Sequence, residues 1–386
     1  MELIRRIIAA FVNRLFPPRK HRALILVSEQ EHDAVQQIKR RFKFYLPDWS
    51  LRECQCGVGG DPSSQLFAAA LRMVPVLYAG QHDPKKAPGI LRHNPLYWLN
   101  PCTNCREAWE WHELVQQHVP PPDVEGARRR LLCFHEKLNL GRFDKAYVFG
   151  TGPSLARATE RDWSDGARIV CNTIVRDAEL WRHIEPHFVV AADAGYHFSF
   201  VKHAQAFRAD LKRRLKETDT LFVYPAGFDA VVRREFGDFT DRLIPVPNGP
   251  QQTLCYDFAK DLSFPEFHNI LPRMLAIACW LADEIGLWGF DGRAPDAQHF
   301  WDNSSRHSYP ELMAELREAY PAFFEEHVPK QDQQRYVRWA FGDSLEQCLS
   351  EAESHGKRFV MMHDTWTETL QRRRVPEQKE TEGTEG

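Results

Sequence analysis

The stretch Ala146-Tyr147-Val148-Phe149-Gly150-Thr151-Gly152-Pro153-Ser154-Leu155 decides the fold of this chain. Its first four residues form an apolar run typical of a buried β-strand, and two glycines follow at once. Glycines permit a tight turn and let an anion approach backbone N–H groups where a helix starts. Ser154 can donate its hydroxyl or cap that helix, and Pro153 fixes φ for helix entry while removing one N–H. The loop is therefore predicted to bind a nucleotide phosphate.

Apolar runs on both sides of this stretch predict further strands of the same sheet. The predicted strands are 146–149, 168–171, 188–191, 221–224, 243–246, 285–288 and 358–362. Helical stretches separate several of them, and the one at 271–283 is apolar nearly all round, as expected of a helix buried against a sheet. Repeated strand–helix units predict an α/β fold with a Rossmann-like, doubly wound and mostly parallel sheet. Ligands of such sheets bind at the carboxyl ends of the strands.

The 386 residues suit about two domains rather than one. Near the N-terminus, apolar runs at 23–27 and 74–78 flank a helical segment at 32–42, which predicts a second, smaller α/β unit. The chain is expected to divide into an amphipathic helix (1–18), the small α/β domain (19–95), a linker or cap (96–143), the Rossmann-like nucleotide-binding domain (144–366) and a disordered tail (367–386).

The first 18 residues carry apolar side chains at helical spacing, with arginines on or near the other side. The apolar stretch is interrupted and has no small-residue cleavage site, so it is a poor signal peptide. Such a helix can dock on its own domain, or residues 1–22 can make peripheral contact with an anionic membrane surface. No run of about 18 apolar residues predicts a membrane-spanning helix.

Composition favours a cytoplasmic protein that has no nucleic-acid partner. The net charge of −3 gives no global basic field. Nine cysteines, without a secretory signal, indicate reduced thiols. The pairs Cys54/Cys56 and Cys102/Cys105, with His112, are also compatible with structural zinc, but the pairs are far apart and free thiols are the preferred interpretation.

Two other interpretations of the glycine loop remain beside a nucleotide-phosphate site. It can be a tight strand-to-helix turn that binds nothing. It can belong to an NAD or flavin fold, although that fingerprint needs a third glycine near Leu155 and an acidic residue at the end of the second strand, where Asn172 stands. A Walker-type loop is excluded because the chain has no G-x-x-x-x-G-K-[ST] motif.

Three features together resemble a known family. They are G-x-G-P-S-L after the first strand, Cys171-Asn172 after the second, and Gly289-Phe290-Asp291 at the end of a late strand. They are similar to the bacterial sialyltransferases of glycosyltransferase family 42 and to the related MptE-like (DUF115) proteins, over residues 144–364. The resemblance implies an inverting, metal-independent transferase that uses a CMP-activated acid sugar, of the sialic acid or Kdo type, and needs no other cofactor.

The resemblance also implies roles for individual residues. Gly150, Gly152 and Ser154 would lie at the CMP phosphate, with Thr151 and Pro153 in the same loop, and Asn172 would face the cytidine or ribose. His307 resembles the catalytic histidine of the family, and His299 falls near a residue that holds the leaving phosphate. The chain departs from the family pattern at Leu271-Pro272 and in the segment after Asp291, where Arg293 and His299 replace expected tyrosines.

The residues themselves support the same chemistry. A histidine near neutral pKa suits the base that takes the acceptor proton, and Arg293 and His299 can stabilise the leaving phosphate. The chain has no Asp-x-Asp, the usual holder of a metal in nucleotide-sugar transferases. Asp193 and Asp291 end predicted strands and are expected at the nucleotide crevice, although Asp193 can equally cap the following helix.

The leading hypothesis is a bacterial glycosyltransferase of surface polysaccharide or lipooligosaccharide synthesis, acting on a glycan or glycolipid acceptor at the cytoplasmic membrane face. One alternative is an MptE-like diphosphokinase that uses ATP and Mg²⁺, for which Asp193 and Asp291 are the obvious carboxylate pair. Another alternative is a nucleotide-binding module without catalytic activity.

Overall fold

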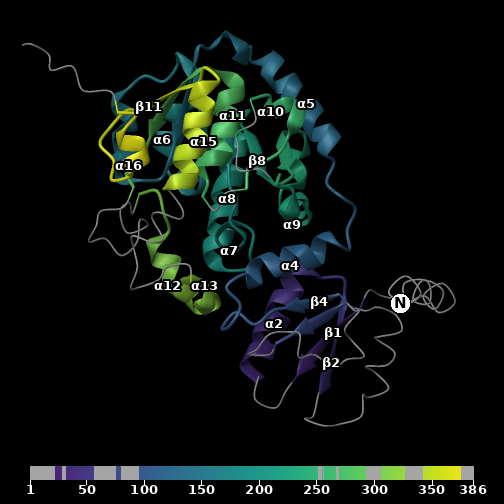
Figure 1. Cartoon of the computed structure of the whole chain (residues 1–386). Helices are drawn as coiled ribbons and strands as arrows, with labels where there is room; N and C mark the ends of the chain where they lie inside the picture. The colour runs from purple at the N-terminus through teal and green to yellow at the C-terminus, as the bar shows by residue number, and fades with distance from the viewer. Residues whose placement is uncertain are drawn as a thin grey trace, which may run out of the picture.

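The structure is a computed structural model of the whole chain (Figure 1). It describes residues 22–27, 32–55, 75–79, 95–250, 254, 256–266, 269–292, 306–326 and 342–374. The expected helix over 1–18, and the candidate site residues Arg293 and His299, lie outside the described residues.

The main sheet has seven strands, and every pair of neighbours runs parallel. In chain order these strands are β5 (Lys145–Phe149), β6 (Gly166–Cys171), β7 (Phe188–Val190), β8 (Leu221–Pro225), β9 (Leu243–Val246), β10 (Glu284–Trp288) and β11 (Arg358–Met361). Their spatial order is β11-β10-β5-β6-β7-β8-β9. The Rossmann-like α/β fold is confirmed, and all seven predicted strands are present. The sheet is fully parallel where a mostly parallel one was predicted.

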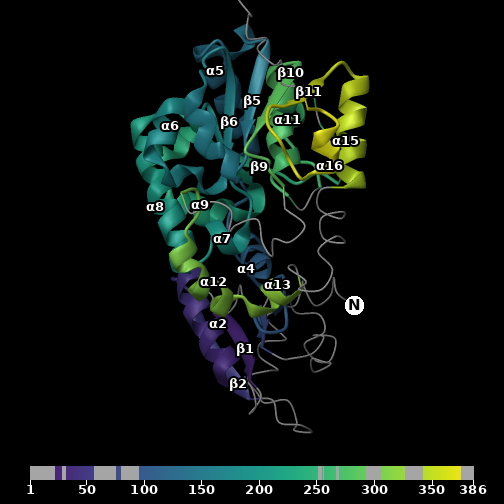
Figure 2. The ribbon, with the colours of Figure 1, turned by 90° about the vertical axis from the view of Figure 1, so that its left-hand side faces the viewer.

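Both faces of the main sheet are buried, which explains its continuous apolar strands. In β5, Ala146 and Val148 face one hydrophobic core, and Tyr147 and Phe149 face the other. The first core is covered by α5 (Val124–Lys137), α10 (Phe258–Asp261), α11 (Leu271–Leu281) and α15 (Asp343–Ser354). Figures 1 and 2 show α11 and α15 on one side of the strands and α6 and α8 on the other.

The opposite core lies under helices that connect β5 through β9. They are η4 (Pro153–Glu160), η5 (Asn172–Arg176), α6 (Ala178–Ile184), α7 (Ala194–His197), α8 (Lys202–Glu217), η6 (Ala226–Phe228), α9 (Asp229–Glu235) and η7 (Gly237–Arg242). After β9 the chain crosses to the other face through α10 and α11 and adds β10 beside β5. Crossovers of one hand place successive strands in one direction, so this change of face reverses the direction of growth. The reversal lies between β5 and β10.

The small N-terminal unit has a four-stranded parallel sheet of order β2-β1-β3-β4. Its elements are β1 (Arg22–Val27), α2 (His32–Tyr45), β2 (Ser50–Gln55), β3 (Val76–Tyr78), β4 (Leu96–Trp98) and α4 (Glu107–Gln116). Apolar residues of α2 and α4 share one core with the strands, among them Ile38, Phe42, Trp111 and Leu114. The expected small α/β unit is therefore present.

The predicted domain boundaries need two corrections. Residues 96–143 are not a linker, because β4 and α4 complete the small unit while α5 packs on the main sheet. The connection between the units is the short segment 117–123. The second correction concerns the tail predicted from 367: α16 (Glu368–Gln371) follows β11, and Arg373 binds Glu346 and Glu353 at 2.7–3.0 Å. Residues 375–386 lie outside the described part.

The remaining described elements cap the ends of the main domain. They are η3 (Leu140–Arg142), η9 (Pro310–Leu312), α12 (Met313–Ala319) and α13 (Pro321–Glu326). Figure 1 places α12 and α13 beside α4, between the main sheet and the small unit. Within the described residues, no helix combines the length and apolar character needed to cross a membrane.

Candidate functional site

The carboxyl edge of the main sheet is the expected place for a ligand, and the reversal of strand order marks its centre. The Gly150–Ser154 loop leaves β5 there, and Gly289–Asp291 leaves β10 beside it. Asn172 and Asp193 follow β6 and β7 on the same edge. The structure therefore brings the predicted strand-end residues to one edge of the sheet, as expected.

The glycine loop packs directly against the segment that follows β10. Gly150 N–H donates to the Trp288 carbonyl at 2.7 Å, and Gly152 N–H donates to the Gly289 carbonyl at 2.8 Å. A Cβ at position 150 would lie 2.4 Å from the Gly289 oxygen, and one at position 152 would lie 2.1 Å from Asp291 Oδ2. The glycines are thus required for the approach of two backbone segments.

Asp291 occupies the position that was predicted for a phosphate. Its carboxylate accepts the Ser154 N–H at 3.1 and 3.2 Å and the Ser154 hydroxyl at 2.8 Å, where η4 begins. A negative group is favoured at a helix start for the same reason that a phosphate is. The predicted phosphate role of Gly152 and Ser154 therefore needs correction, because an internal carboxylate and a carbonyl already take their N–H groups. Thr151 is half-buried and Pro153 is exposed in the same loop.

His363, which the sequence analysis missed, completes this cluster. Its Nε2 accepts the Gly289 N–H at 2.8 Å and lies 2.8 Å from Ser154 Oγ, while Nδ1 is 2.6 Å from the Asp364 carbonyl. These partners place the ring proton on Nδ1, and burial holds the pKa of His363 below its usual value. The single lone pair of Nε2 is already used, so His363 cannot take the Ser154 proton as a serine hydrolase would. We call Gly150–Ser154, Gly289–Asp291 and His363 the closed half of the edge.

Asn172, at the end of β6, differs from the residues of the closed half in its backbone conformation and in its hydrogen bonding. Its φ is +48°, a left-handed conformation that asparagine tolerates better than most residues. Its side-chain oxygen is buried and has no hydrogen-bond partner among the described residues. An unsatisfied buried amide oxygen costs about 1–3 kcal/mol, and its position at the carboxyl edge of the sheet makes Asn172 a candidate ligand contact.

Asp193 and Arg273 lie next to each other at the end of β7. Asp193 Oδ1 accepts the Tyr196 N–H at 2.9 Å and caps α7, and burial raises the pKa of Asp193 to about 6. Arg273, in the first turn of α11, donates to the Ala192 carbonyl at 3.5 Å. Burial lowers the pKa of Arg273 to about 10, so it stays protonated, and its buried Nε has no hydrogen-bond partner among the described residues. We call Asn172, Asp193 and Arg273 the open half.

Arg273 was also missed, although the sequence holds a signal for it. It is the one charged residue in the helix Leu271–Leu281, and every other residue of that helix is apolar. A charge on such a helix is costly unless it has a partner or a function. Asp193 was predicted both as a nucleotide-site residue and as a helix cap, and the structure shows that it caps α7 while it stands at the edge.

His307 does not stand where a catalytic base is needed. Its side chain is fully buried, and Nε2 lies 3.4 Å from Oδ2 of Asp177, the N-cap residue of α6. Thr173 and Arg176 bind the carbonyls of His307 and Ser308. Burial lowers its pKa. The prediction that His307 takes the acceptor proton is therefore corrected, because in the described structure this side chain anchors the returning segment against η5 and α6.

Asp193 and Asp291 do not form the carboxylate pair considered for Mg²⁺. They follow β7 and β10, which β5 and β6 separate, so three strand spacings of about 4.8 Å lie between them. Asp291 is also committed to Ser154. Within the described part of the chain, no three His, Cys, Asp or Glu side chains form a group that could hold a metal. His112 is packed against the rings of Tyr45 and Phe228.

Comparison with known proteins identifies no matching family model, no matching curated protein and no matching solved structure.

Proposed function

We propose that this protein is a glycosyltransferase whose activated-sugar donor lies across the open half of the carboxyl edge. The observation that carries the proposal is the proximity of Asp193, an acid with a pKa of about 6, to Arg273, a buried cation whose Nε has no hydrogen-bond partner among the described residues. Perturbed ionisable groups at the carboxyl edge of a parallel sheet are typical of catalytic sites. The fold and the resemblance to glycosyltransferase family 42 add support.

In the proposed reaction the donor is a CMP-activated acid sugar of the sialic acid or Kdo type. The acceptor hydroxyl attacks the anomeric carbon, the bond from that carbon to the phosphate oxygen breaks, and CMP leaves with inversion. Asp193 takes the hydroxyl proton, a role that its pKa near the working pH favours. Arg273 stabilises the charge that develops on the leaving phosphate, and Asn172 offers its amide to the ribose or base. The mechanism needs no metal.

The test is a transfer and hydrolysis assay with CMP-sialic acid and CMP-Kdo in the presence of EDTA, together with calorimetric titration of CMP. We expect binding of CMP and metal-independent release of CMP from one donor. Asp193→Asn should lower kcat by about 10²–10⁴-fold, because asparagine keeps the helix cap and loses the base. Asp257→Asn is the matched control, since Asp257 caps α10 in the same way and is exposed. Failure to bind CMP or any other nucleotide would end the proposal.

A further inference from the structure

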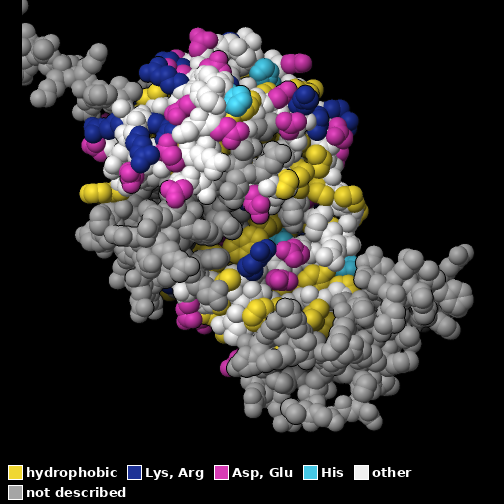
Figure 3. All heavy atoms as spheres, viewed as in Figure 1, with side chains coloured by type: hydrophobic (Ala, Val, Ile, Leu, Met, Phe, Trp, Pro, Cys, Tyr) yellow, Lys and Arg dark blue, Asp and Glu magenta, His cyan; other side chains and the backbone are white. Residues whose placement is uncertain are grey.

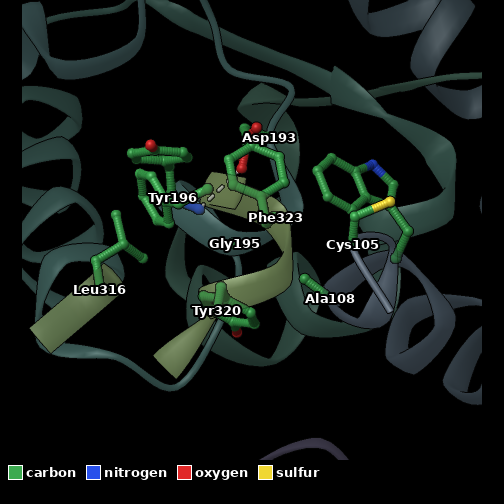
Figure 4. A pocket seen from close by; sticks show the side chains of 10 residues that line it. Cys105, Ala108, Asp193, Gly195, Tyr196, Leu316, Tyr320 and Phe323 are labelled. Atoms are coloured by element: carbon green, nitrogen blue, oxygen red, sulfur yellow. Dashed lines mark hydrogen bonds between the residues drawn. The ribbon is translucent and has the colours of Figure 1, made fainter. Parts of the chain in front are cut away.

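The small unit meets the main domain along its helices α2 and α4. On the face shown in Figure 3, hydrophobic side chains lie where the two units meet. Figure 4 shows one part of this junction, where Ala108 of α4, Gly195 of α7 and Tyr320, between α12 and α13, line the same small space. That space has room for about one water molecule. At this point the junction is therefore packed like a protein interior.

Arg41, on α2, crosses the junction between the two units. Its guanidinium is fully buried and lies over two rings of the main domain, Phe200 and Tyr320, at 4.7 and 5.3 Å from the ring centroids. It donates to the Ala319 carbonyl at 2.5 Å and pairs with Glu107 at 2.8 Å. One buried cation thus joins α2 and α4 of the small unit to α12 of the main domain.

Phe44, one helical turn after Arg41, makes the reverse contact. Two arginines of the main domain lie over its half-buried ring, Arg208 of α8 at 5.3 Å and Arg234 of α9 at 4.8 Å. Residues three apart lie on the same face of a helix. This face of α2 therefore presents a cation to main-domain rings and a ring to main-domain cations, two contacts that depend on geometry and fit only one placement of the helix.

Apolar contacts alone would not fix the placement of the small unit as strictly. Hydrophobic burial is non-directional, and two units of one chain commonly move relative to each other. A buried guanidinium differs, because a displacement that separates Arg41 from Glu107 and from the Ala319 carbonyl leaves a charge buried and unpaired. Such a displacement is costly, so the contacts of Arg41 favour one position of the small unit.

We propose that Arg41 and Phe44 hold the small unit in a single orientation on the main domain, so that the two units do not open and close against each other. Helix α4 contacts α7, which Asp193 caps, and the small unit is then a fixed wall beside the open half. Access to the open half does not depend on a motion between the two units. This inference does not rest on the proposed function.

The test measures the distance between two spin labels attached to p-acetylphenylalanine in the full chain, one at exposed Gln36 on α2 and one at exposed Lys216 on α8. We expect one narrow distance distribution in the otherwise unchanged protein. Arg41→Met/Glu107→Gln should broaden it, because both charges are removed, while the glutamine still accepts the Trp111 N–H. The melting temperature of this double variant should exceed that of Glu107→Gln alone, which leaves Arg41 buried without a counter-charge.

Arg358→Met/Glu284→Gln is the matched control, since this pair is solvent-accessible and joins two strands of the main sheet. It should leave the distance distribution and the melting temperature unchanged. If the double variant at the junction does not fold, Phe44→Leu takes its place, because it removes the ring beneath Arg208 and Arg234 and should also broaden the distribution. A broad or two-peaked distribution in the otherwise unchanged protein, or a narrow one in the junction variant that folds, would overturn the proposal.

Discussion

In the closed half of the carboxyl edge, the loop amides of Gly150, Gly152 and Ser154 all find acceptors inside the protein, whereas in the open half Asn172 and Arg273 keep polar atoms without partners among the described residues. The two halves are neighbours in one sheet and share its geometry. Glycines after a strand therefore do not by themselves make a phosphate site. What indicates a ligand is a polar group that the protein leaves unsatisfied.

The largest loss of stability should come from adding a methyl group where the two backbone segments of the closed half touch. Gly150→Ala would place a methyl 2.4 Å from the Gly289 carbonyl and 2.9 Å from the Phe290 ring, and backbone cannot move aside easily. We expect a loss of about 3 kcal/mol or more in the free energy of unfolding, measured by urea denaturation. Gly237→Ala is the control, since nothing lies within 4 Å of its added Cβ. Equal stability of both variants would show that the two segments are not packed as described.

A smaller loss in the free energy of unfolding is expected when the Asp291 carboxylate, which binds the Ser154 N–H and hydroxyl, is removed. Asp291→Ala leaves the Ser154 N–H and hydroxyl without this acceptor, which should cost about 2 kcal/mol in chemical denaturation. Asp364→Ala is the matched control from the neighbouring loop, because Asp364 is largely exposed and pairs only with Arg374 among the described cations. If Asp291→Ala unfolds at the same urea concentration as Asp364→Ala, the Asp291 carboxylate does not stabilise the loop and the closed half is not closed by it.

In the open half, the stability of the fold should depend on pH through the Asp193 carboxyl. The pKa of Asp193 rises from its ordinary 3.8 to about 6 on folding, so folding favours the protonated form. Its contribution to stability is fully present below about pH 4 and is lost as the pH rises through about 6. Asp193→Asn should therefore gain in melting temperature relative to wild type between pH 4 and pH 7. A difference that stays constant over this range would contradict the burial of an ionisable carboxyl at the end of β7.

Much of the fold could be predicted from the sequence because its strands are buried on both faces and read as continuous apolar runs. The N-terminal α/β unit was harder to predict from the sequence. β4 has three residues, and α4 mixes Glu and His with tryptophans because it packs between two units, so its apolar residues do not follow one stripe.

The strand-end positions of Asn172, Asp193 and Asp291 were also predictable, because parallel strands end on one edge. What could not be predicted is which polar groups meet one another. Asp291 lies 137 residues from Ser154, and His307 lies 130 residues from Asp177. Because of these contacts, the predicted phosphate-binding Ser154 and the predicted base His307 bind other residues of the chain.

The position of the phosphate is tested by calorimetric titration of CMP into wild type, Arg273→Gln and Ser154→Ala. We expect Arg273→Gln to weaken CMP binding by at least about tenfold, through the loss of one charge-assisted hydrogen bond, and Ser154→Ala to stay within about twofold of wild type. If Ser154→Ala weakens CMP binding as much as Arg273→Gln, or if Arg273→Gln binds like wild type, the phosphate is not held by the open half.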